Sequence, residues 1–167
     1  MKKLYLVRHA KSSWASPNVD DFDRPLNERG SADAPRMASL LNQREVAPTL
    51  MISSPAIRAL TTCRLFAETM HYEQSQIILE RKLYHASEET LLSVLSTIDN
   101  NEESVMLFAH NPGITEFANA LLKISIDNIP TCGIVGALLN IRSWKEISFG
   151  CGQMEFFIYP KMALLNH

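Results

Sequence analysis

Residues 4–9 have the sequence Leu-Tyr-Leu-Val-Arg-His, a short apolar run that ends in two basic side chains. Four apolar residues followed by polar ones are typical of a buried strand, and they are too few for a signal-peptide core or a membrane span. We therefore expect a strand over residues 4–7. Arg8 and His9 then lie at its carboxyl end, where open α/β sheets bind their ligands.

The same pattern recurs at residues 50–52 and 105–109, and each of these runs leads into a segment with helical spacing of its apolar residues. Ser54 is expected to cap the first of these helices, with Pro55 at its first helical position. Gly113 is expected to open the other helix. These two segments predict strand–helix units of the kind that build parallel sheets.

Two further helices are predicted from the spacing of apolar residues after Ser31 and after Ser87. Ser31 is expected to act as the N-cap of the earlier helix, with Pro35 close enough to the first turn to be tolerated. Residues 77–79 give a weaker strand signal. The polar stretch before Ser31, residues 11–29, shows no apolar period and is predicted to be a loop.

The end of the chain changes character, because residues 135–141 and 154–159 are two apolar runs without a clear helix between them. They predict a terminal hairpin or edge pair. Together with the alternating strands and helices, this predicts an α/β fold with a mostly parallel central sheet covered on both faces. A length of 167 residues favours a single domain over residues 1–167.

Composition excludes several classes of protein. Sixteen Lys and Arg against eighteen Asp and Glu give a net charge of -2, which provides no extended basic surface for a nucleic acid or an anionic membrane. The three cysteines, Cys63, Cys132 and Cys151, are an odd number without CxxC spacing, so neither a disulfide framework nor a zinc module is expected. We expect a cytoplasmic protein.

Basic side chains follow each of the main predicted strands. Arg8 and His9 follow the first, Arg58 lies in the helical turn after the second, and His110 follows the third. Because the carboxyl ends of parallel strands meet at one edge of the sheet, these four side chains are expected to converge. Such a cluster repels itself unless an anion lies within it, and paired guanidinium groups suit phosphate. Taken singly, His9 would be a structural histidine and Arg8 a surface ion-pair partner.

Several segments together resemble a known family. Leu6-Val7-Arg8-His9-Ala10 resembles the signature of the histidine phosphatase superfamily, with Ala10 where that family usually has Gly. The second and third blocks of the family are similar to residues 53–59 and 109–113, in order and spacing. Within the superfamily the chain resembles the SixA-type phosphohistidine phosphatases, and the segments that carry this resemblance are residues 8–14, 24–30 and 83–87.

The resemblance implies a three-layer α/β/α sandwich of the phosphoglycerate-mutase-like type. It also implies that His9 is the nucleophile of a phosphatase that forms a covalent phosphohistidine, while Arg8, Arg58 and His110 hold the phosphoryl oxygens. A neutral imidazole is a competent nucleophile near pH 7, and arginines can stabilise the charge on the transferring group. No metal or other cofactor is expected. The implied substrate is a protein phosphohistidine.

The general acid is an open question. Larger relatives place a Glu where this chain has His85, and a phosphate ester needs a proton donor for its leaving oxygen. The missing carboxylate therefore favours a phosphoramidate, whose leaving group is a nitrogen. Glu80 is an alternative acid, although a solvated turn carboxylate is the commoner explanation for such a residue. His85 is either a wall of the site or a surface residue.

The loop after the first strand holds further candidates. Arg24 is either part of an exposed charge run or a cation at the phosphate, where it would bind the anion or organise the loop. Lys11 and Ser12 are expected either to bind phosphate or to cap the turn. Trp14 is a candidate substrate contact, but a half-buried anchor of the loop is the interpretation we favour.

Three rival functions are compatible with parts of this pattern. A small-molecule phosphomonoesterase or phosphoglycerate-mutase-like enzyme would act on a small phosphorylated substrate and would need an acid. A non-catalytic phosphate-binding module would keep the cationic cluster without turnover. A metal site on His9, His85 and His110 has neither the spacing nor the companion carboxylate expected of one. No nucleic-acid or membrane partner is expected, and the oligomeric state is left open.

Overall fold

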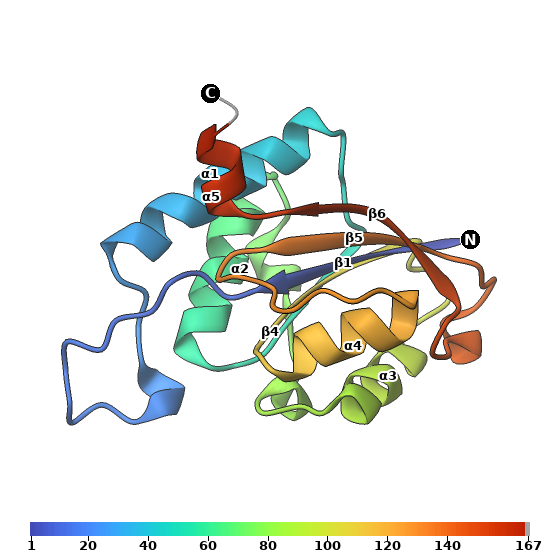
Figure 1. Cartoon of the computed structure of the whole chain (residues 1–167), viewed down its shortest axis with the longest axis horizontal. Coiled ribbons are helices and arrows are strands. Elements are labelled where there is room, and N and C mark those ends of the chain that lie inside the picture. Colours follow the sequence, from blue (N-terminus) through green and yellow to red (C-terminus); the bar gives the residue numbers. More distant parts are fainter. Residues whose placement is uncertain (166–167) are drawn as a thin grey trace.

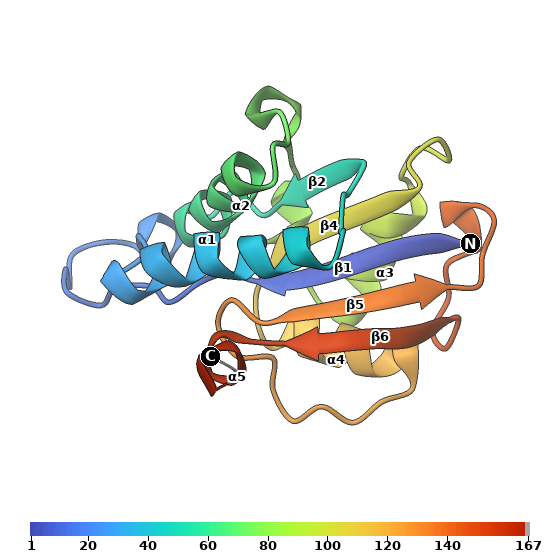
Figure 2. The same cartoon turned by 90° about the horizontal axis from the view of Figure 1, so that it is seen from above.

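A six-stranded sheet lies at the centre of the computed structural model, which describes residues 1–165 (Figure 1). The strands lie side by side in the order β3-β2-β4-β1-β5-β6 (Figure 2). Their bounds are β1 (Lys2–Arg8), β2 (Leu50–Ser53), β3 (Ile78–Leu79), β4 (Ser104–Ala109), β5 (Ile134–Leu139) and β6 (Gly152–Ile158). The first four strands of that order are parallel, and β5 is antiparallel to both β1 and β6.

Helices cover both faces of the sheet (Figure 1). Their bounds are α1 (Glu28–Gln43), α2 (Ile57–Thr69), α3 (Glu88–Ser96), α4 (Gly113–Leu122) and α5 (Pro160–Leu165). One layer contains α1, α2 and α5, and the other contains α3 and α4. These layers and the mostly parallel sheet confirm the predicted fold class.

The alternation of side chains along β1 explains how one short strand serves two hydrophobic cores. Leu4 and Leu6 pack with α3 and α4 on one face, whereas Tyr5 and Val7 pack with α1 and α2 on the other. Successive side chains of a strand point to opposite faces, so a strand buried on both faces must be continuously apolar. That requirement accounts for the uninterrupted run at residues 4–7.

Helix α1 begins earlier than its sequence pattern predicts. The N-cap is Asn27, whose side chain accepts a hydrogen bond from the Gly30 amide at 2.8 Å, so the predicted cap at Ser31 is wrong. Gly30 allows this start, because a Cβ on it would lie 2.1 Å from the carbonyl oxygen of Lys11. The first turn of α1 thereby packs directly against the segment that follows His9. Pro35 lies inside the helix rather than in its first turn.

Helix α2 begins later than predicted, at Ile57, with Ala56 rather than Ser54 at the N-cap. Ser54 is therefore not the cap and Pro55 is not the first helical residue. The Ser54 hydroxyl instead lies 2.8 Å from the Nε2 of His110. A residue that sequence rules assign to helix capping is thus a partner of a candidate site residue.

The terminal strand pair is confirmed, but the elements around it were not all predicted. Short 3-10 helices occupy Asp21–Asp23 in the predicted loop and Trp144–Glu146 between β5 and β6. Helix α5 follows β6 and was not predicted from the sequence. Within residues 1–165, no helix is long and apolar enough to cross a membrane.

Candidate active site

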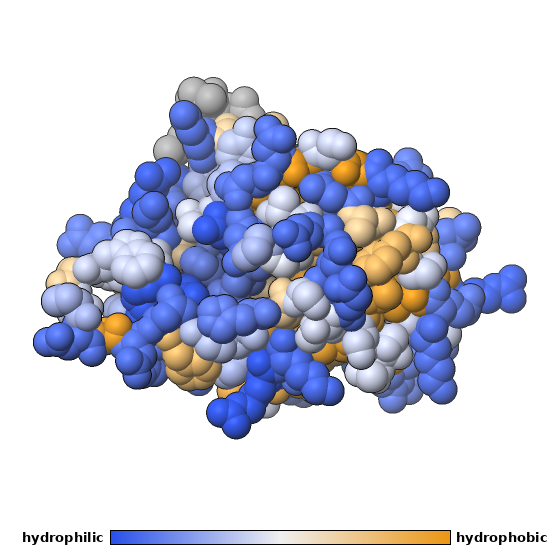
Figure 3. All heavy atoms as spheres, turned by 60° about the horizontal axis from the view of Figure 1, so that its bottom comes forward, coloured by the Kyte–Doolittle hydropathy of each residue, from blue (hydrophilic) through white to orange (hydrophobic). Residues whose placement is uncertain are grey.

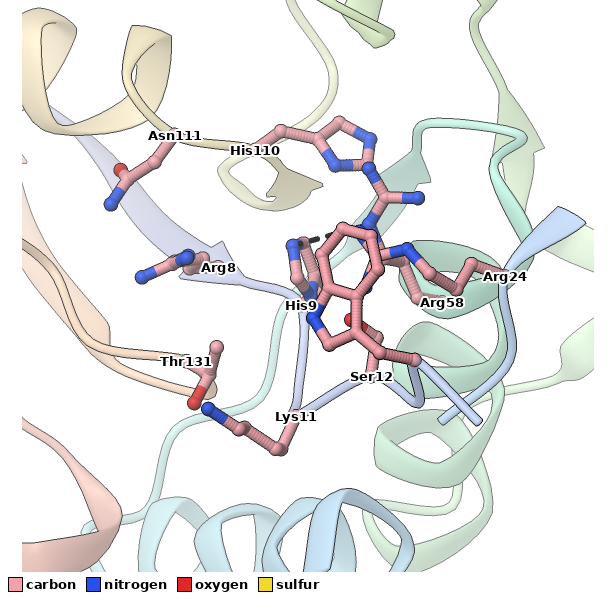
Figure 4. Close-up of a pocket in the computed structure, with 10 residues that line it drawn as sticks. Arg8, His9, Lys11, Ser12, Arg24, Arg58, His110, Asn111 and Thr131 are labelled. Carbon is pink, nitrogen blue, oxygen red and sulfur yellow. Dashed lines mark hydrogen bonds between the residues drawn. The ribbon is translucent and has the colours of Figure 1, made fainter. Parts of the chain in front are cut away.

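A cavity of about 210 Å³ opens where β1, β4 and the first turn of α2 meet (Figure 4). Five of its lining residues are predicted site residues, namely Arg8, His9, Arg24, Arg58 and His110. The others are Lys11, Ser12, Trp14, Asn111 and Thr131. The convergence expected from the strand ends is therefore present, and it includes Arg24.

His9 lies in the middle of the cavity, directly after β1, and is 6% exposed. Its Nδ1 is 2.8 Å from the carbonyl oxygen of Ala10, which can only accept a hydrogen bond. The Nδ1 must therefore carry the proton of the neutral ring, which leaves the lone pair on Nε2. Burial, opposed by this hydrogen bond and aided by nearby arginines, lowers the pKa of His9 to about 4. The ring is uncharged near pH 7.

The turn after His9 is held by a short relay of hydrogen bonds. The Ala10 amide donates to the Thr62 hydroxyl at 2.9 Å, and that hydroxyl donates to the carbonyl of Arg58 at 2.7 Å. Ala10 is fully buried and its backbone lies outside the left-handed region, so no glycine is needed there. The departure from the usual Gly of the family signature is thus compatible with the geometry of the turn.

Arg58 and Arg24 form one side of the cavity (Figure 4). Arg58 projects from the first turn of α2, and its Nε lies 3.4 Å from the Nε2 of His9. Its two terminal nitrogens donate to Asp21, one to the carbonyl at 2.6 Å and one to the carboxylate at 3.0 Å. Arg24 donates to the same carboxylate at 3.1 Å and to the hydroxyl of Ser12. Arg24 therefore both lines the cavity and organises the loop.

Asp21 is a site residue that the sequence did not predict, because it lies in a loop segment of mixed charges, and such segments are usually solvated. Its carboxylate accepts hydrogen bonds from Arg24, Arg58 and the Tyr84 hydroxyl, the last at 2.7 Å. The bond from Tyr84, together with those from the two arginines, holds the pKa of Asp21 well below its usual range. No periodicity or spacing in the sequence marks this residue.

Arg8 occupies the other side of His9 and has fewer partners. One terminal nitrogen donates to the carbonyl of Ile129 at 3.0 Å, and the buried Nε of Arg8 has no hydrogen-bond partner in the described part of the chain. Burial, with a smaller contribution from Arg58, lowers the pKa of Arg8 below its ordinary value. The same Ile129 carbonyl also accepts from the Asn111 amide, which links Arg8 to the end of β4.

His110 follows β4 and faces His9, with 5.3 Å between the ring centroids. Its Nε2 lies 2.8 Å from the Ser54 hydroxyl, whereas its buried Nδ1 has no hydrogen-bond partner among residues 1–165. Burial, and then the neighbouring His9 and Arg58, lowers the pKa of His110 to about 3. This imidazole is also neutral near pH 7 and can offer one N–H to an anion.

The two candidates for an acid lie outside this cavity. Glu80 is not among its lining residues, and the Glu80 carboxylate accepts from the Lys82 amide at 3.1 Å, as in the solvated-turn alternative. His85 is exposed and lines a neighbouring hollow of about 270 Å³, which it shares with His110. Within the described chain, no three His, Cys, Asp or Glu side chains gather in a group that could hold a metal ion.

Comparisons with known proteins identify the family and the fold of this chain. The family model described as the histidine phosphatase superfamily (branch 1) matches residues 4–88. The crystal structure of a protein assigned as the phosphohistidine phosphatase SixA of Agrobacterium tumefaciens has a TM-score of 0.82 and 30% identity, over 95% of this chain and 98% of that chain.

Two further matches are similar in extent. The structure of the protein histidine phosphatase SixA complexed with tungstate has a TM-score of 0.81 and 19% identity, over 95% of this chain and 97% of that chain. A chloroplastic protein of Arabidopsis thaliana, itself uncharacterised, is 32% identical over 155 residues, which are 87% of this chain and 70% of that protein.

Proposed function

The chain belongs to the histidine phosphatase superfamily, and we propose that it removes the phosphoryl group from protein phosphohistidine through a covalent intermediate on His9. Both the fold of the chain and its family support a phosphatase. The observation that carries this proposal is the state of His9. It is a buried neutral imidazole with Nδ1 fixed as the donor, so Nε2 presents its lone pair among arginines.

In the first step the Nε2 of His9 attacks the phosphorus, and the bond from phosphorus to the substrate imidazole breaks. The electron pair of that bond goes to the leaving nitrogen. If the other ring nitrogen of the substrate carries a proton, the leaving group is a neutral imidazole and needs no acid. In the second step water attacks the phosphorus, the bond to Nε2 breaks, and His9 regains its lone pair while Nδ1 keeps its proton. The product leaves as dihydrogen phosphate, which carries both protons of the water.

The groups around His9 are suited to stabilise the transferring phosphoryl group. Arg8 and Arg58 lie on opposite sides of His9 and provide guanidinium donors for the oxygens that carry charge in the transition state (Figure 4). Within residues 1–165, the buried Nε of Arg8 and the buried Nδ1 of His110 have no hydrogen-bond partner. The Nε of Arg8 always carries a proton, whereas the Nδ1 of His110 is a donor only in the tautomer in which the Ser54 hydroxyl donates to Nε2. A buried donor without a partner costs about 1–3 kcal/mol, and phosphoryl oxygens would remove that cost.

The lining of the cavity favours a nitrogen leaving group. Within residues 1–165 its lining contains no carboxylate, and the carboxylate of Glu80, the acid considered from the sequence, accepts a hydrogen bond from the Lys82 amide instead. An alkoxide leaving from a phosphate ester would need a proton that no carboxylic acid at this site supplies. A small-molecule monoesterase is the rival function, and it would need a different proton donor. A cytoplasmic location remains a prediction from the sequence.

The test measures phosphate release from a phosphohistidine protein and from p-nitrophenyl phosphate in EDTA. Wild type is compared with His9→Ala and, as a matched control, with His71→Ala, which replaces an exposed histidine outside the cavity. We expect rapid turnover of the phosphohistidine that exceeds ester hydrolysis, is lost in His9→Ala and is retained in His71→Ala. Faster ester hydrolysis would favour the monoesterase, and binding without turnover would favour a phosphate-binding module.

A further inference from the structure

Trp14 is an exposed aromatic side chain at the cavity, and the favoured sequence interpretation of a half-buried anchor is wrong. Its side chain is 76% exposed, although it lines the cavity with Arg24 and Ser12. The other tryptophan, Trp144, is fully buried, and its indole N–H donates to the carbonyl of Glu102 at 2.7 Å. A large apolar surface left in water next to a cationic site calls for a different explanation from packing.

The surroundings of Trp14 fix its orientation. The guanidinium carbon of Arg24 lies 3.7 Å from the centroid of the Trp14 ring, which is a cation–π contact with one face of the ring. Ser12 pairs with Leu26 in an isolated bridge, and the Ser13 amide donates to the carbonyl of Pro25 at 2.8 Å. The segment that carries Trp14 is therefore tied to the segment that carries Arg24.

The exposed indole is not part of an extended apolar patch. Figure 3 shows mostly hydrophilic residues on the side of the loop between β1 and α1, with only small apolar areas among them, whereas a larger apolar area lies toward the opposite side. Among the described residues, Trp14 is the one large apolar side chain in the lining of the cavity, whose other members are basic, polar or imidazole groups. A local role at this cavity therefore fits better than a broad docking surface.

In-line transfer places the leaving group opposite the nucleophile. Because His9 lies in the buried interior of the cavity, a leaving group opposite it points outward, toward the exposed part of the lining where Trp14 lies. A phosphorylated histidine would bring an imidazole ring to this position. Arg24 contacts one face of the indole, and the exposed remainder of the ring can contact the imidazole of the substrate.

We propose that Trp14 is a specificity-determining residue, which packs against the aromatic leaving group and favours phosphoimidazole substrates over ring-free ones. The inference rests on the proposed function and names the part of the substrate that the residue contacts. Aromatic pairs are worth a modest amount beyond area burial, so the expected discrimination is roughly 3- to 10-fold.

The test compares kcat/KM for phosphoimidazole with that for phosphoramidate, which has the same phosphorus–nitrogen bond and no ring. The variants are Trp14→Ala, Trp14→Phe and, as a control for loss of another exposed aromatic, Phe149→Ala, whose side chain is 41% exposed and lies outside the cavity. We expect Trp14→Ala to reduce the phosphoimidazole value roughly 3- to 10-fold more than the phosphoramidate value. Trp14→Phe should restore most of this preference, and Phe149→Ala should keep that of wild type.

Equal losses on both substrates in Trp14→Ala would overturn the inference, because they would mean that the indole acts only by holding Arg24. A second pair, the esters phenyl phosphate and methyl phosphate, separates this inference from the proposed function. If wild type hydrolyses these esters but hydrolyses neither phosphoimidazole nor phosphoramidate, the phosphohistidine assignment and the imidazole contact both fail. An unchanged preference for phenyl phosphate in Trp14→Ala would then also exclude any contact with an aromatic leaving group.

Discussion

The two sides of the cavity hold their arginines in different ways. Arg58 and Arg24 are bound to the carboxylate of Asp21, so part of their charge is compensated before any substrate arrives. Among the residues that the structure describes, Arg8 has only the neutral carbonyl of Ile129 as a side-chain partner, and burial lowers the pKa of Arg8. One side is therefore an ion-pair network that orients its cations. The other side keeps an uncompensated, partly buried cation whose natural partner is the substrate.

This difference separates contributions to stability from contributions to function. A buried charge without a counter-charge is costly, and it persists where binding requires it. Arg8 should therefore destabilise the free protein and stabilise the complex with phosphate. Arg58 should contribute to both states, because its bonds to Asp21 exist without substrate.

The largest expected effect comes from replacing each arginine with methionine, which keeps most of the side-chain volume. Arg8→Met and Arg58→Met should each lower kcat/KM by about 10²–10³, as loss of a donor to a transition state does. Their effects on the free energy of unfolding should differ. Arg8→Met should leave stability unchanged or raise it, whereas Arg58→Met should lower it by about 1–2 kcal/mol. If denaturant unfolding showed that Arg8→Met and Arg58→Met destabilise the protein equally, the proposed difference between the two sides of the cavity would be wrong.

Acidification tests the two histidines between these sides. An unfolded histidine takes up a proton near pH 6.5, whereas folded His9 does so only near about 4 and His110 near about 3. The unfolded state therefore binds more protons between these values, and stability falls as pH falls. From pH 7 to pH 5 the loss should be about 2 kcal/mol for each ring.

Unfolding curves at pH 7 and pH 5 measure this loss, and NMR titration of the two imidazoles locates their midpoints. Asp21 stays ionised over this range in both states, because its folded pKa is depressed, so it does not contribute to the slope. His9→Asn keeps a donor near the Nδ1 position and should reduce the pH dependence by about half. Imidazole midpoints near pH 6.5 would contradict the account of the buried neutral site.

The smallest expected effect concerns Asp21, the residue that binds the arginines on one side of the cavity only. Asp21→Asn removes the charge that binds Arg24 and Arg58, whereas Asp20→Asn makes the same change of charge at an exposed neighbouring position without a side-chain capping bond. The Asp21 side chain is 43% exposed, so water screens its ion pairs and weakens them. We therefore expect Asp21→Asn to lose about 1 kcal/mol of transition-state stabilisation, which lowers kcat/KM roughly fivefold relative to Asp20→Asn. Identical kinetics in the two variants would show that the carboxylate does not orient the arginines.

The convergence of the strand ends was predictable because sheet topology brings them to one edge. Short apolar runs located β1 and β4, and a parallel arrangement then placed Arg8, His9 and His110 together. Asp21 was not predictable in this way. Its role depends on the path of an irregular loop, and mixed charges in a loop are usually solvated.

Local rules also failed where tertiary contacts overrode them. Ser31 and Ser54 both fit the rules for helix caps, but close packing of Gly30 on Lys11 moves one helix start, and the pairing of Ser54 with His110 accompanies the other. The exposure of Trp14 could not be predicted from residue type, since the type alone favours burial.

Trapping the phosphorylated intermediate tests most directly whether His9 is the covalent nucleophile. Wild type is mixed rapidly with a phosphohistidine protein labelled on the phosphoryl group and quenched in alkali, where phosphohistidine survives. The protein is then digested and the labelled peptide identified. We predict transient phosphorylation of His9, absent in His9→Ala and present in His71→Ala. Turnover without any label on His9, or a label on His110 instead, would contradict the central claim.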